Sequence, residues 1–406
     1  MSGTLFLAHR IPFPPDRGDK IRSHHVLSAL AKFAPVHVGC FAESAADRVH
    51  EGHLAQLAAS HCMPLRAKSL AFAGVEALAR REPVSLAAFR HDHLAQWVRA
   101  TLEREEIDTI YVFSGQMGQY VPADWPGRVI VDLVDVDSAK FEAYGRRAHG
   151  PARWIHAREA RLLASEEARL AARAQCTLLV SEAEAALLRS RVGPGCRIEA
   201  LGNGIDAARF DPRGVSAHSA LAGRGPHLVF TGQMDYLPNA EAALRVIERL
   251  LPAIRENHPG AAFHVVGRAP KAALRAHDGR GGVRVWGEVP DVRPFLAAAD
   301  LVIAPLEIAR GVQNKVLEAM AMARPVLLTP GAATGIAARD GEHFAVAETD
   351  AELVERAHDL LRDRAAAEAM GKAARRFVLE QMSWPAMLAR LPAIVGRESS
   401  EGRHAA

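Results

Sequence analysis

Residues 310–325 carry charged side chains at a spacing suited to binding a nucleotide diphosphate. They read R-G-V-Q-N-K-V-L-E-A-M-A-M-A-R-P and follow an apolar run, 301–305, that predicts a buried strand. We expect a helix that starts at Gly311 and ends before Pro325, with its apolar residues facing a core. The polar residues of its first turns are Arg310, Asn314, Lys315 and Glu318.

This helix start predicts an anion site beside a carboxylate. Free backbone N–H groups and the positive end of the helix dipole favour an anion there. Arg310 and Lys315 add two cations, which suit a diphosphate, and Glu318 suits the vicinal hydroxyls of a ribose. Any one of these residues, taken alone, is better explained by a solvated helix cap. The group as a whole favours a ligand site, because α/β folds bind ligands at the carboxyl ends of their strands.

Composition indicates a globular protein of two or three domains. The chain has 406 residues, 49% of them hydrophobic, and a formal net charge of +3, whereas one domain usually has about 100–200 residues. So small a positive charge gives no reason to expect a nucleic-acid partner. Aromatic residues are too sparse, at 6%, for the base-stacking surfaces that such partners need.

The cysteines and the N-terminus favour a cytoplasmic protein that needs no metal or other cofactor. Cys40, Cys62, Cys176 and Cys196 form no C-x-x-C pair, so we expect reduced thiols rather than disulfides or a zinc site. The first apolar run is too short for a signal peptide. No run of about 18 apolar residues predicts a membrane span.

Alternating apolar runs and helical patterns predict an α/β fold with two doubly wound, Rossmann-like parallel-sheet domains facing across a cleft. Strands are expected at 5–8, 36–41, 109–113, 129–134 and 176–181, and again at 227–232, 262–267, 283–286, 301–305, 326–329 and 343–346. We expect an N-terminal domain at 1–205, a nucleotide-sugar-binding domain at 206–380, a helix at 381–396 packing back across the domains, and a flexible tail at 397–406.

The chain resembles the GT-B glycosyltransferases of glycosyltransferase family 4 along essentially its whole length. The motifs that carry the resemblance are L-G-N-G-I-D at 201–206, F-T-G-Q-M-D-Y at 230–236, V-V-G-R at 265–268, G-E-V-P-D-V at 287–292 and N-K-V-L-E-A-M-A-M-A-R-P at 314–325. It is most similar to sugar transferases associated with exosortase-type exopolysaccharide loci, through H-R-I-P-F-P-P-D-R-G-D-K-I-R-S at 9–23 and D-L-V-D-V-D-S-A-K at 132–140.

The resemblance implies a retaining transferase that holds a nucleoside-diphosphate sugar in its C-terminal domain, with Glu318 on the ribose. Two positions depart from the family pattern. Arg310 stands where the family has a first glutamate, and Gln233 replaces an arginine that follows Gly232. We therefore assign the stabilisation of the leaving diphosphate to Arg310 and Lys315.

Four other segments are candidates for substrate contact. Gly18, Asp19 and Lys20 close a proline-rich loop after the first strand, where the family resemblance implies contact with donor and acceptor. Asp135 and Asp137 follow the strand 129–134 and are candidates for acid/base work or sugar contact, with a helix cap or a salt bridge as the alternative. Arg268 and the backbone of Val289 are candidates for bordering the nucleotide base, unless they belong to plain strand-end turns.

The helix around 146–173 is rich in arginine, which suits an anionic membrane surface. Interleaved Glu159, Glu166 and Glu167 make internal pairing the favoured explanation. The sequence thus predicts a glycosyltransferase acting on a saccharide or lipid-linked saccharide acceptor, cytoplasmic or at the inner face of the membrane. A nucleotide-sugar epimerase of the same fold and a non-catalytic sugar-nucleotide-binding subunit are the alternatives.

Overall fold

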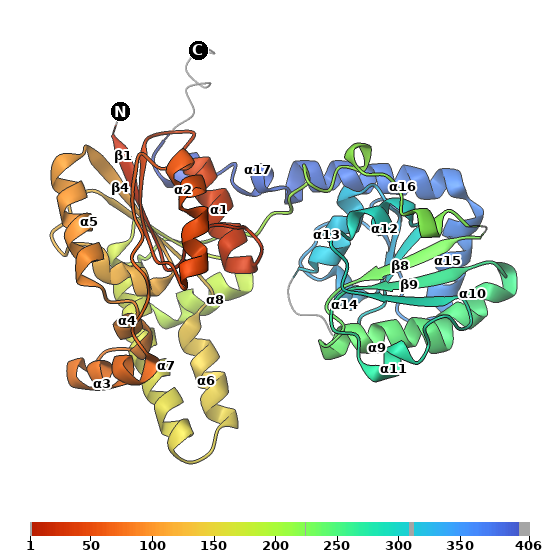
Figure 1. Ribbon diagram of the computed structural model, residues 1–406, viewed down its shortest axis with the longest axis horizontal. Helices are drawn as coiled ribbons and strands as arrows, with labels where there is room; N and C mark the ends of the chain where they lie inside the picture. The colour runs from red at the N-terminus through yellow and green to blue at the C-terminus, as the bar shows by residue number, and fades with distance from the viewer. Residues whose placement is uncertain (1, 224, 308–311, 398–406) are drawn as a thin grey trace, which may run out of the picture. The chain divides into compact units, whose positions relative to one another are not determined.

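The computed structural model describes residues 2–223, 225–307 and 312–397. Its contacts divide the chain into two compact units. The N-terminal unit runs to Asn203 and resumes at Met387, and the C-terminal unit is Gly204–Ala386. Figure 1 shows a sheet covered by helices in each unit. The predicted α/β class, with two Rossmann-like parallel sheets, is confirmed.

The N-terminal unit is built on a seven-stranded parallel sheet in the order β3-β2-β1-β4-β5-β6-β7. Its strands are β1 (Gly3–Ala8), β2 (Val36–Cys40), β3 (Ser60–Cys62), β4 (Ile107–Phe113), β5 (Arg128–Val134), β6 (Cys176–Leu179) and β7 (Ile198–Ala200). The central strands are apolar on both faces, as expected for a sheet covered by helices on both sides. Every residue of β1 is buried, and Leu5, Phe6 and Leu7 have no exposed surface.

The helices of this unit follow the strands in the alternating pattern. They are α1 (Gly18–Leu30), η1 (Ala45–His50), α2 (Glu51–Leu57), α3 (Leu70–Arg80), α4 (Val84–Ala88), α5 (Asp92–Arg104), η2 (Gly115–Tyr120), α6 (Asp137–Arg147), α7 (Pro151–Arg173), α8 (Glu182–Arg191) and α18 (Leu391–Ile394). Helices α6 and α7 form a hairpin, seen in yellow in Figure 1. Its turn uses Gly150 at a positive φ of 59° and Pro151 at the first helical position, which is typical of a helix start.

The C-terminal unit has a six-stranded parallel sheet in the order β10-β9-β8-β11-β12-β13. Its strands are β8 (His227–Thr231), β9 (Ala262–Val266), β10 (Val283–Gly287), β11 (Leu301–Ala304), β12 (Val326–Leu328) and β13 (Ala345–Val346). Its longer helical segments are α9 (Leu237–Arg245), η5 (Val246–Leu250), α10 (Leu251–Asn257), α12 (Arg293–Ala298), α13 (Asn314–Ala321), α15 (Asp350–Arg362), α16 (Arg364–Phe377) and η6 (Val378–Met382). The shorter ones are η3 (Pro212–Gly214), η4 (Ser219–Leu221), α11 (Ala272–Arg275) and α14 (Pro330–Ala333), and α17 (Trp384–Met387) spans the second boundary between the units.

The unit boundaries differ by a few residues from those expected at 205 and 381. Ile205 belongs to the C-terminal unit because its N–H donates to the Met382 carbonyl at 2.8 Å and its carbonyl accepts from the Trp384 N–H at 3.3 Å. The expected single helix at 381–396 is two short helices, α17 and α18. Pro385 and Pro392 each lie at the second residue of one of them, where proline is tolerated at a helix start but not inside a longer helix.

Two short strands, β3 and β7, lie at the edges of the first sheet and were not predicted. Each has three residues, too few to show a period in the sequence. Helix α1 begins at Gly18, so Gly18, Asp19 and Lys20 form its first turn rather than closing the preceding loop. The strand β5 ends at Val134. Asp135 and Asp137 therefore follow the strand, as expected, and Asp137 is the first residue of α6.

Candidate functional site

In the C-terminal unit the strand order reverses between β8 and β11. Open α/β sheets bind ligands at the carboxyl ends of their strands at such a switch point. Gly232 and Gln233 directly follow β8, and Lys315 and Glu318 lie on α13, the helix after β11. The fold therefore brings these four predicted residues to the position where a ligand is expected.

Three neighbouring strands end here in closely packed glycines. Gly232 has φ 155°, Gly267 has φ 150° and Gly287 has φ 70°, values that side chains disfavour. The Gly232 N–H donates to Val266 O at 3.0 Å, and the Gly267 N–H donates to Gly287 O at 2.8 Å. A Cβ on Gly267 would lie 1.6 Å from the Gly232 carbonyl oxygen. Backbone atoms thus make the closest contacts between these strand ends.

Lys315 points its ammonium into this region. Its Nζ donates a hydrogen bond to Asn239 Oδ1 and lies 4.9 Å from the centre of the Phe230 ring. Burial lowers the pKa of Lys315 to about 8, although the charge of Glu318 acts to raise it. With this pKa the amine is still charged at neutral pH, and an anionic ligand would stabilise its charged form.

Asn239 connects the lysine to the loop after β8 and was not predicted from the sequence. Its side chain is 5% exposed and lies in the first turns of α9. While Oδ1 accepts from Lys315, Nδ2 donates to the Gln233 carbonyl at 2.9 Å. The signal for Asn239 in the sequence is an asparagine a few residues after the glycine that follows a strand. An amide buried at such a place needs defined hydrogen-bond partners.

Glu318 is half-buried, and among the described residues its carboxylate has no hydrogen-bond partner. Burial raises its pKa, while the charges of Arg209 and Lys315 act to lower it. Arg209, an exposed residue that the sequence did not single out, is therefore a second cation close to this carboxylate. A carboxylate left without donors is suited to accepting hydrogen bonds from ligand hydroxyls.

The remaining predicted residues of this unit that the structure describes are Arg268, Asn314 and Val289. Arg268 Nη2 donates to Gln233 Oε1 at 2.7 Å, and both side chains are exposed. Asn314 is exposed at the first position of α13, and Val289 is half-buried just after β10. Arg310 and Gly311 fall outside the described residues. Of the two expected diphosphate cations, the structure therefore places only Lys315.

In the N-terminal unit the strand order reverses between β1 and β4, and Asp19 lies near this point. Its carboxylate is bonded to Arg10 and lies 3.3 Å from His9 Nε2 and 3.2 Å from Arg17 Nε. Burial alone would raise the pKa of Asp19, but hydrogen bonds from His9 and Arg10 hold it well below its ordinary value. His9 itself stacks on Phe113 at the end of β4. The structure thus gives Asp19 a charged setting that includes His9.

Gly18 and Lys20 lie beside Asp19 in α1 but have different surroundings. A Cβ on Gly18 would meet nothing within 4 Å, so neither crowding nor a positive φ requires glycine there. Lys20 is 6% exposed, and its ammonium donates to Phe13 O at 3.1 Å and to Asp47 Oδ1 at 3.2 Å. The lysine therefore braces the loop before α1, and its contact with a ligand stays a prediction.

Asp135 and Asp137 follow an unusual turn at the end of β5. Val134 has φ 70°, and the Asp135 N–H donates to Leu133 O at 2.9 Å. A β-branched residue in this region is strained, and such strain concentrates at functional sites. Burial raises the pKa of Asp135, helped by the charges of Glu184 and Asp137. Asp137 instead pairs with Lys140 at 2.9 Å, which is the salt bridge weighed from the sequence.

The neighbouring Asp132 is structural. It is fully buried and accepts three hydrogen bonds from Nε and Nη2 of Arg22, the shortest from Nε at 2.9 Å, and one from the Tyr111 hydroxyl at 2.8 Å. Arg22 Nη1 also donates to Leu201 O at 2.7 Å. These contacts tie α1, β4 and β5 to the segment that leads out of the N-terminal unit.

Among residues 2–223, 225–307 and 312–397, no three His, Cys, Asp or Glu side chains are grouped so as to hold a metal ion. Within the same ranges, no helix combines the length and apolar character needed to cross a bilayer.

Solved structures of similar architecture define the class of the fold. HepE of Anabaena, determined with UDP, has a TM-score of 0.64 at 15% identity, covering 98% of this chain and all of HepE. Sucrose-phosphate synthase of Thermosynechococcus elongatus has 0.60 at 15% identity, covering 98% of this chain and 99% of its own. WaaG, a glycosyltransferase involved in lipopolysaccharide biosynthesis, has a TM-score of 0.53 at 18% identity, covering 97% of this chain and 100% of WaaG. The protein has the GT-B fold.

At the level of sequence, the likeness lies in the C-terminal unit. Residues 225–363 match the family model described as "Glycosyl transferases group 1". No curated protein matches the chain. The matched segment runs from just before β8 to just after α15, so it contains the whole second sheet with Gly232, Asn239, Lys315 and Glu318.

Proposed function

We propose that the protein is a retaining glycosyltransferase that moves a hexose from a nucleoside-diphosphate sugar to an acceptor hydroxyl. The observation that carries the proposal is the cluster at the β8/β11 switch point. There the ammonium of Lys315, whose pKa burial lowers, lies one turn before the Glu318 carboxylate on α13, and no donor among the described residues bonds to that carboxylate. The family model covers this segment, and the similar HepE was determined with UDP and with UDP-glucose.

In this proposal Glu318 accepts hydrogen bonds from the ribose hydroxyls, and the diphosphate lies against Lys315 and the glycine strand ends. Arg268 and Arg209 are further described cations near the cluster. Arg268 bonds to Gln233, so its guanidinium is adjacent to the position where the family resemblance leads us to expect an arginine. Asn314 and the backbone of Val289 would contact the nucleotide. The roles of Arg310 and Gly311 in binding the nucleotide diphosphate stay predictions.

The chemistry that we propose breaks the bond from the sugar's anomeric carbon to the diphosphate while the acceptor oxygen bonds to that carbon on the same face. The acceptor proton passes to an oxygen of the leaving diphosphate. The protein then contributes positioning and charge stabilisation rather than a strong base. The segments at 9–23 and 132–140 support an acceptor in exopolysaccharide or related glycoconjugate assembly, as a saccharide or lipid-linked saccharide. Asp19, Asp135 and Asp137 of the N-terminal unit are our candidates for contact with it.

A thermal-shift screen of nucleotide sugars tests donor binding first, because a ligand that binds the native state raises its melting temperature. We expect one nucleoside diphosphate and its sugar to raise the melting temperature of the wild type but not of Lys315→Met. The matched control is Lys372→Met, which removes an exposed lysine on α16 far along the chain from the cluster. Equal shifts in both variants would contradict the assigned site.

Incubation of the identified donor with and without acceptors separates the possible activities. The proposal expects a glycoside whose anomeric configuration, read by NMR, matches that of the donor. Conversion of the donor into its epimer without any acceptor would indicate an epimerase. Binding without turnover on any acceptor would indicate a non-catalytic subunit.

A further inference from the structure

Helix α3 turns a continuous apolar face to the solvent. Leu70 is 69% exposed, Phe72 65%, Val75 69% and Leu78 54%. Ala71 and Ala79 are also exposed on this helix, and no charged residue interrupts the face before Arg80. Soluble proteins rarely expose such contiguous apolar groups unless they bind something. We call Leu70, Phe72, Val75 and Leu78 the α3 face.

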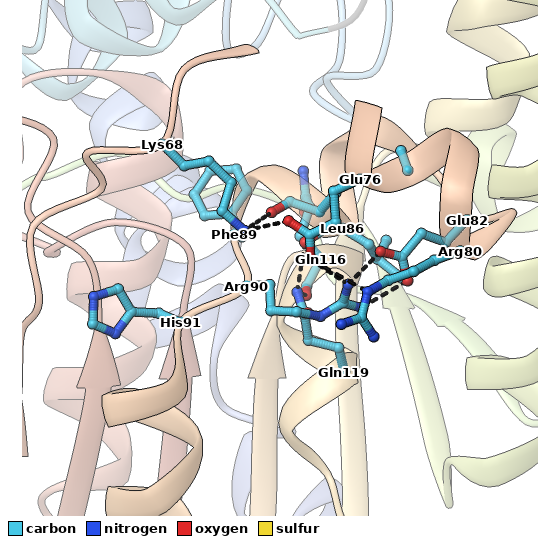
Figure 2. Close-up of polar contacts among 12 residues, drawn as sticks. Lys68, Glu76, Arg80, Glu82, Leu86, Phe89, Arg90, His91, Gln116 and Gln119 are labelled. Carbon is cyan, nitrogen blue, oxygen red and sulfur yellow. Dashed lines mark hydrogen bonds and ion pairs between the residues drawn. The ribbon is translucent and has the colours of Figure 1, made fainter. Parts of the chain in front are cut away.

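The opposite side of α3 is held by small residues and ion pairs. Ala73 and Ala77 are fully buried. Glu76 pairs with Lys68 at 2.7 Å and with Arg90 at 3.0 Å, and Arg90 also pairs with Glu82, as Figure 2 shows. The polar side of this helix therefore faces the protein and the large apolar side faces outward, the reverse of an ordinary surface helix.

The α6–α7 hairpin lies beside the end of α3 and carries more exposed apolar groups. Arg158 of α7 donates to the Ala77 carbonyl at 2.9 Å and to the Glu82 carbonyl at 3.2 Å. About one turn earlier on α7, Trp154 is 62% and Ile155 51% exposed. Tryptophan is typical of side chains that sit at a membrane–water interface.

Arginines surround these groups. Arg80 and Arg81 end α3, and Arg146, Arg147 and Arg153 lie around the hairpin turn, all of them exposed. The sequence favoured internal pairing of the arginines at 146–173 with Glu159, Glu166 and Glu167. That expectation is confirmed for Arg158 and Arg169. It is wrong for Arg146, Arg147 and Arg153. In the described part of the chain, the ion pairs include none of Arg81, Arg146, Arg147 and Arg153.

The glutamates of α7 bond to groups other than the arginines at the hairpin turn. Glu159 accepts from the Val84 and Ser85 N–H groups at the start of α4, and Glu167 accepts from the N–H and hydroxyl of Ser138 in α6. Glu166 pairs with Arg169. These carboxylates bond to helix starts or pair further along α7, so none of these three, among the described residues, pairs with the cations at the hairpin turn.

We propose that the α3 face and the start of the α6–α7 hairpin dock the N-terminal unit onto an anionic lipid surface. The apolar side chains would enter the boundary between headgroups and acyl chains, and the arginines would pair with lipid phosphates. The charge argues against a second copy of the chain, since a symmetric contact through this face would bring like-charged arginines together. The proposal does not depend on the proposed glycosyl transfer, because lipid binding is measured without substrates.

Vesicle sedimentation of the full chain tests the proposal. We expect the wild type to bind vesicles of phosphatidylcholine with phosphatidylglycerol, to bind phosphatidylcholine alone much more weakly, and to lose binding as salt is raised. Phe72→Ser/Val75→Ser should reduce the partition by about tenfold or more. Arg146→Gln/Arg147→Gln/Arg153→Gln should reduce it on anionic vesicles only.

The matched control is Val49→Ser/Leu379→Ser, which removes two apolar side chains that are 79% and 45% exposed on other surfaces. It should bind as the wild type does, and melting temperatures check that every variant is folded. Absence of wild-type binding, equal binding to both vesicle types, or unchanged binding of Phe72→Ser/Val75→Ser would overturn the proposal. So would concentration-dependent dimerisation without vesicle binding that Phe72→Ser/Val75→Ser abolishes, because the face would then be an interface between copies.

Discussion

The carbonyl oxygen of Gly232 lies 1.6 Å from the position that a Cβ on Gly267 would occupy. The two glycines end neighbouring strands, β8 and β9, and both have a positive φ. No side chain fits between these strand ends without moving backbone. The backbone at the base of the candidate donor site is therefore fixed by two residues that have no side chain.

Gly267→Ala should destabilise the C-terminal unit by about 2–3 kcal/mol or more, because backbone must shift and the φ is unfavourable for alanine. Urea unfolding followed by circular dichroism measures this. Gly52→Ala is the control: Gly52 lies in α2 with nothing within 4 Å of its Cβ position. It should raise the free energy of unfolding by about 0.5–1 kcal/mol. Similar effects of the two substitutions would contradict the packing argument.

Asn239→Asp should weaken the binding of a nucleoside diphosphate by about tenfold or more. The new carboxylate would pair with Lys315 in place of the neutral amide and would repel a nearby diphosphate, since like charges in a partly buried site interact strongly. Isothermal titration with UDP as the probe measures the effect. The control is Asn257→Asp on α10, whose amide is exposed and bonds only His358 among the described residues. Unchanged binding by Asn239→Asp would remove Asn239 from the site.

Binding of UDP should weaken as the pH rises above about 8. Burial lowers the pKa of Lys315 to about 8, so its ammonium is charged below this pH and loses its proton above it. Affinity should fall by at most about tenfold per pH unit, until the pH reaches the higher pKa of the amine in the complex. The series should start near pH 7, because a terminal phosphate itself titrates near about pH 6.

Lys315→Arg is the matching variant, since a guanidinium stays charged across this range. Its affinity for UDP should change little between pH 7 and pH 9. An equally steep fall in the variant would show that some other group titrates.

Asp132→Leu should destabilise the N-terminal unit by about 3–5 kcal/mol, because it leaves the guanidinium of Arg22 buried without a counter-charge. Tyr111→Phe removes one hydrogen bond to the same carboxylate, at 2.8 Å, and should cost about 1.5–3 kcal/mol. Equilibrium unfolding in urea measures both. The double variant Arg22→Met/Asp132→Leu should be more stable than Asp132→Leu alone, and a less stable double variant would contradict the pairing.

The sequence by itself determined the alternation of strands and helices, and with it the fold class. Apolar runs such as 227–232 and 301–305 are long and uniform enough to predict buried parallel strands, and the structure has β8 and β11 there. The clustering of Lys315 and Glu318 was also readable, because residues three or four apart on a helix share a face. Both features depend on the local periodicity of the sequence, which is visible without the tertiary structure.

Only the tertiary structure decided which distant residues meet. Asn239 and Lys315 are separated by 76 positions, and no period in the sequence links them. In the segment D-L-V-D, the sequence alone does not distinguish Asp132 from Asp135. In the structure, Asp132 bonds to Arg22 inside the core, whereas Asp135 follows a strained turn. Burial and partner choice depend on how strands are ordered in the sheet, and that order is set by packing of the whole unit rather than by neighbours along the chain.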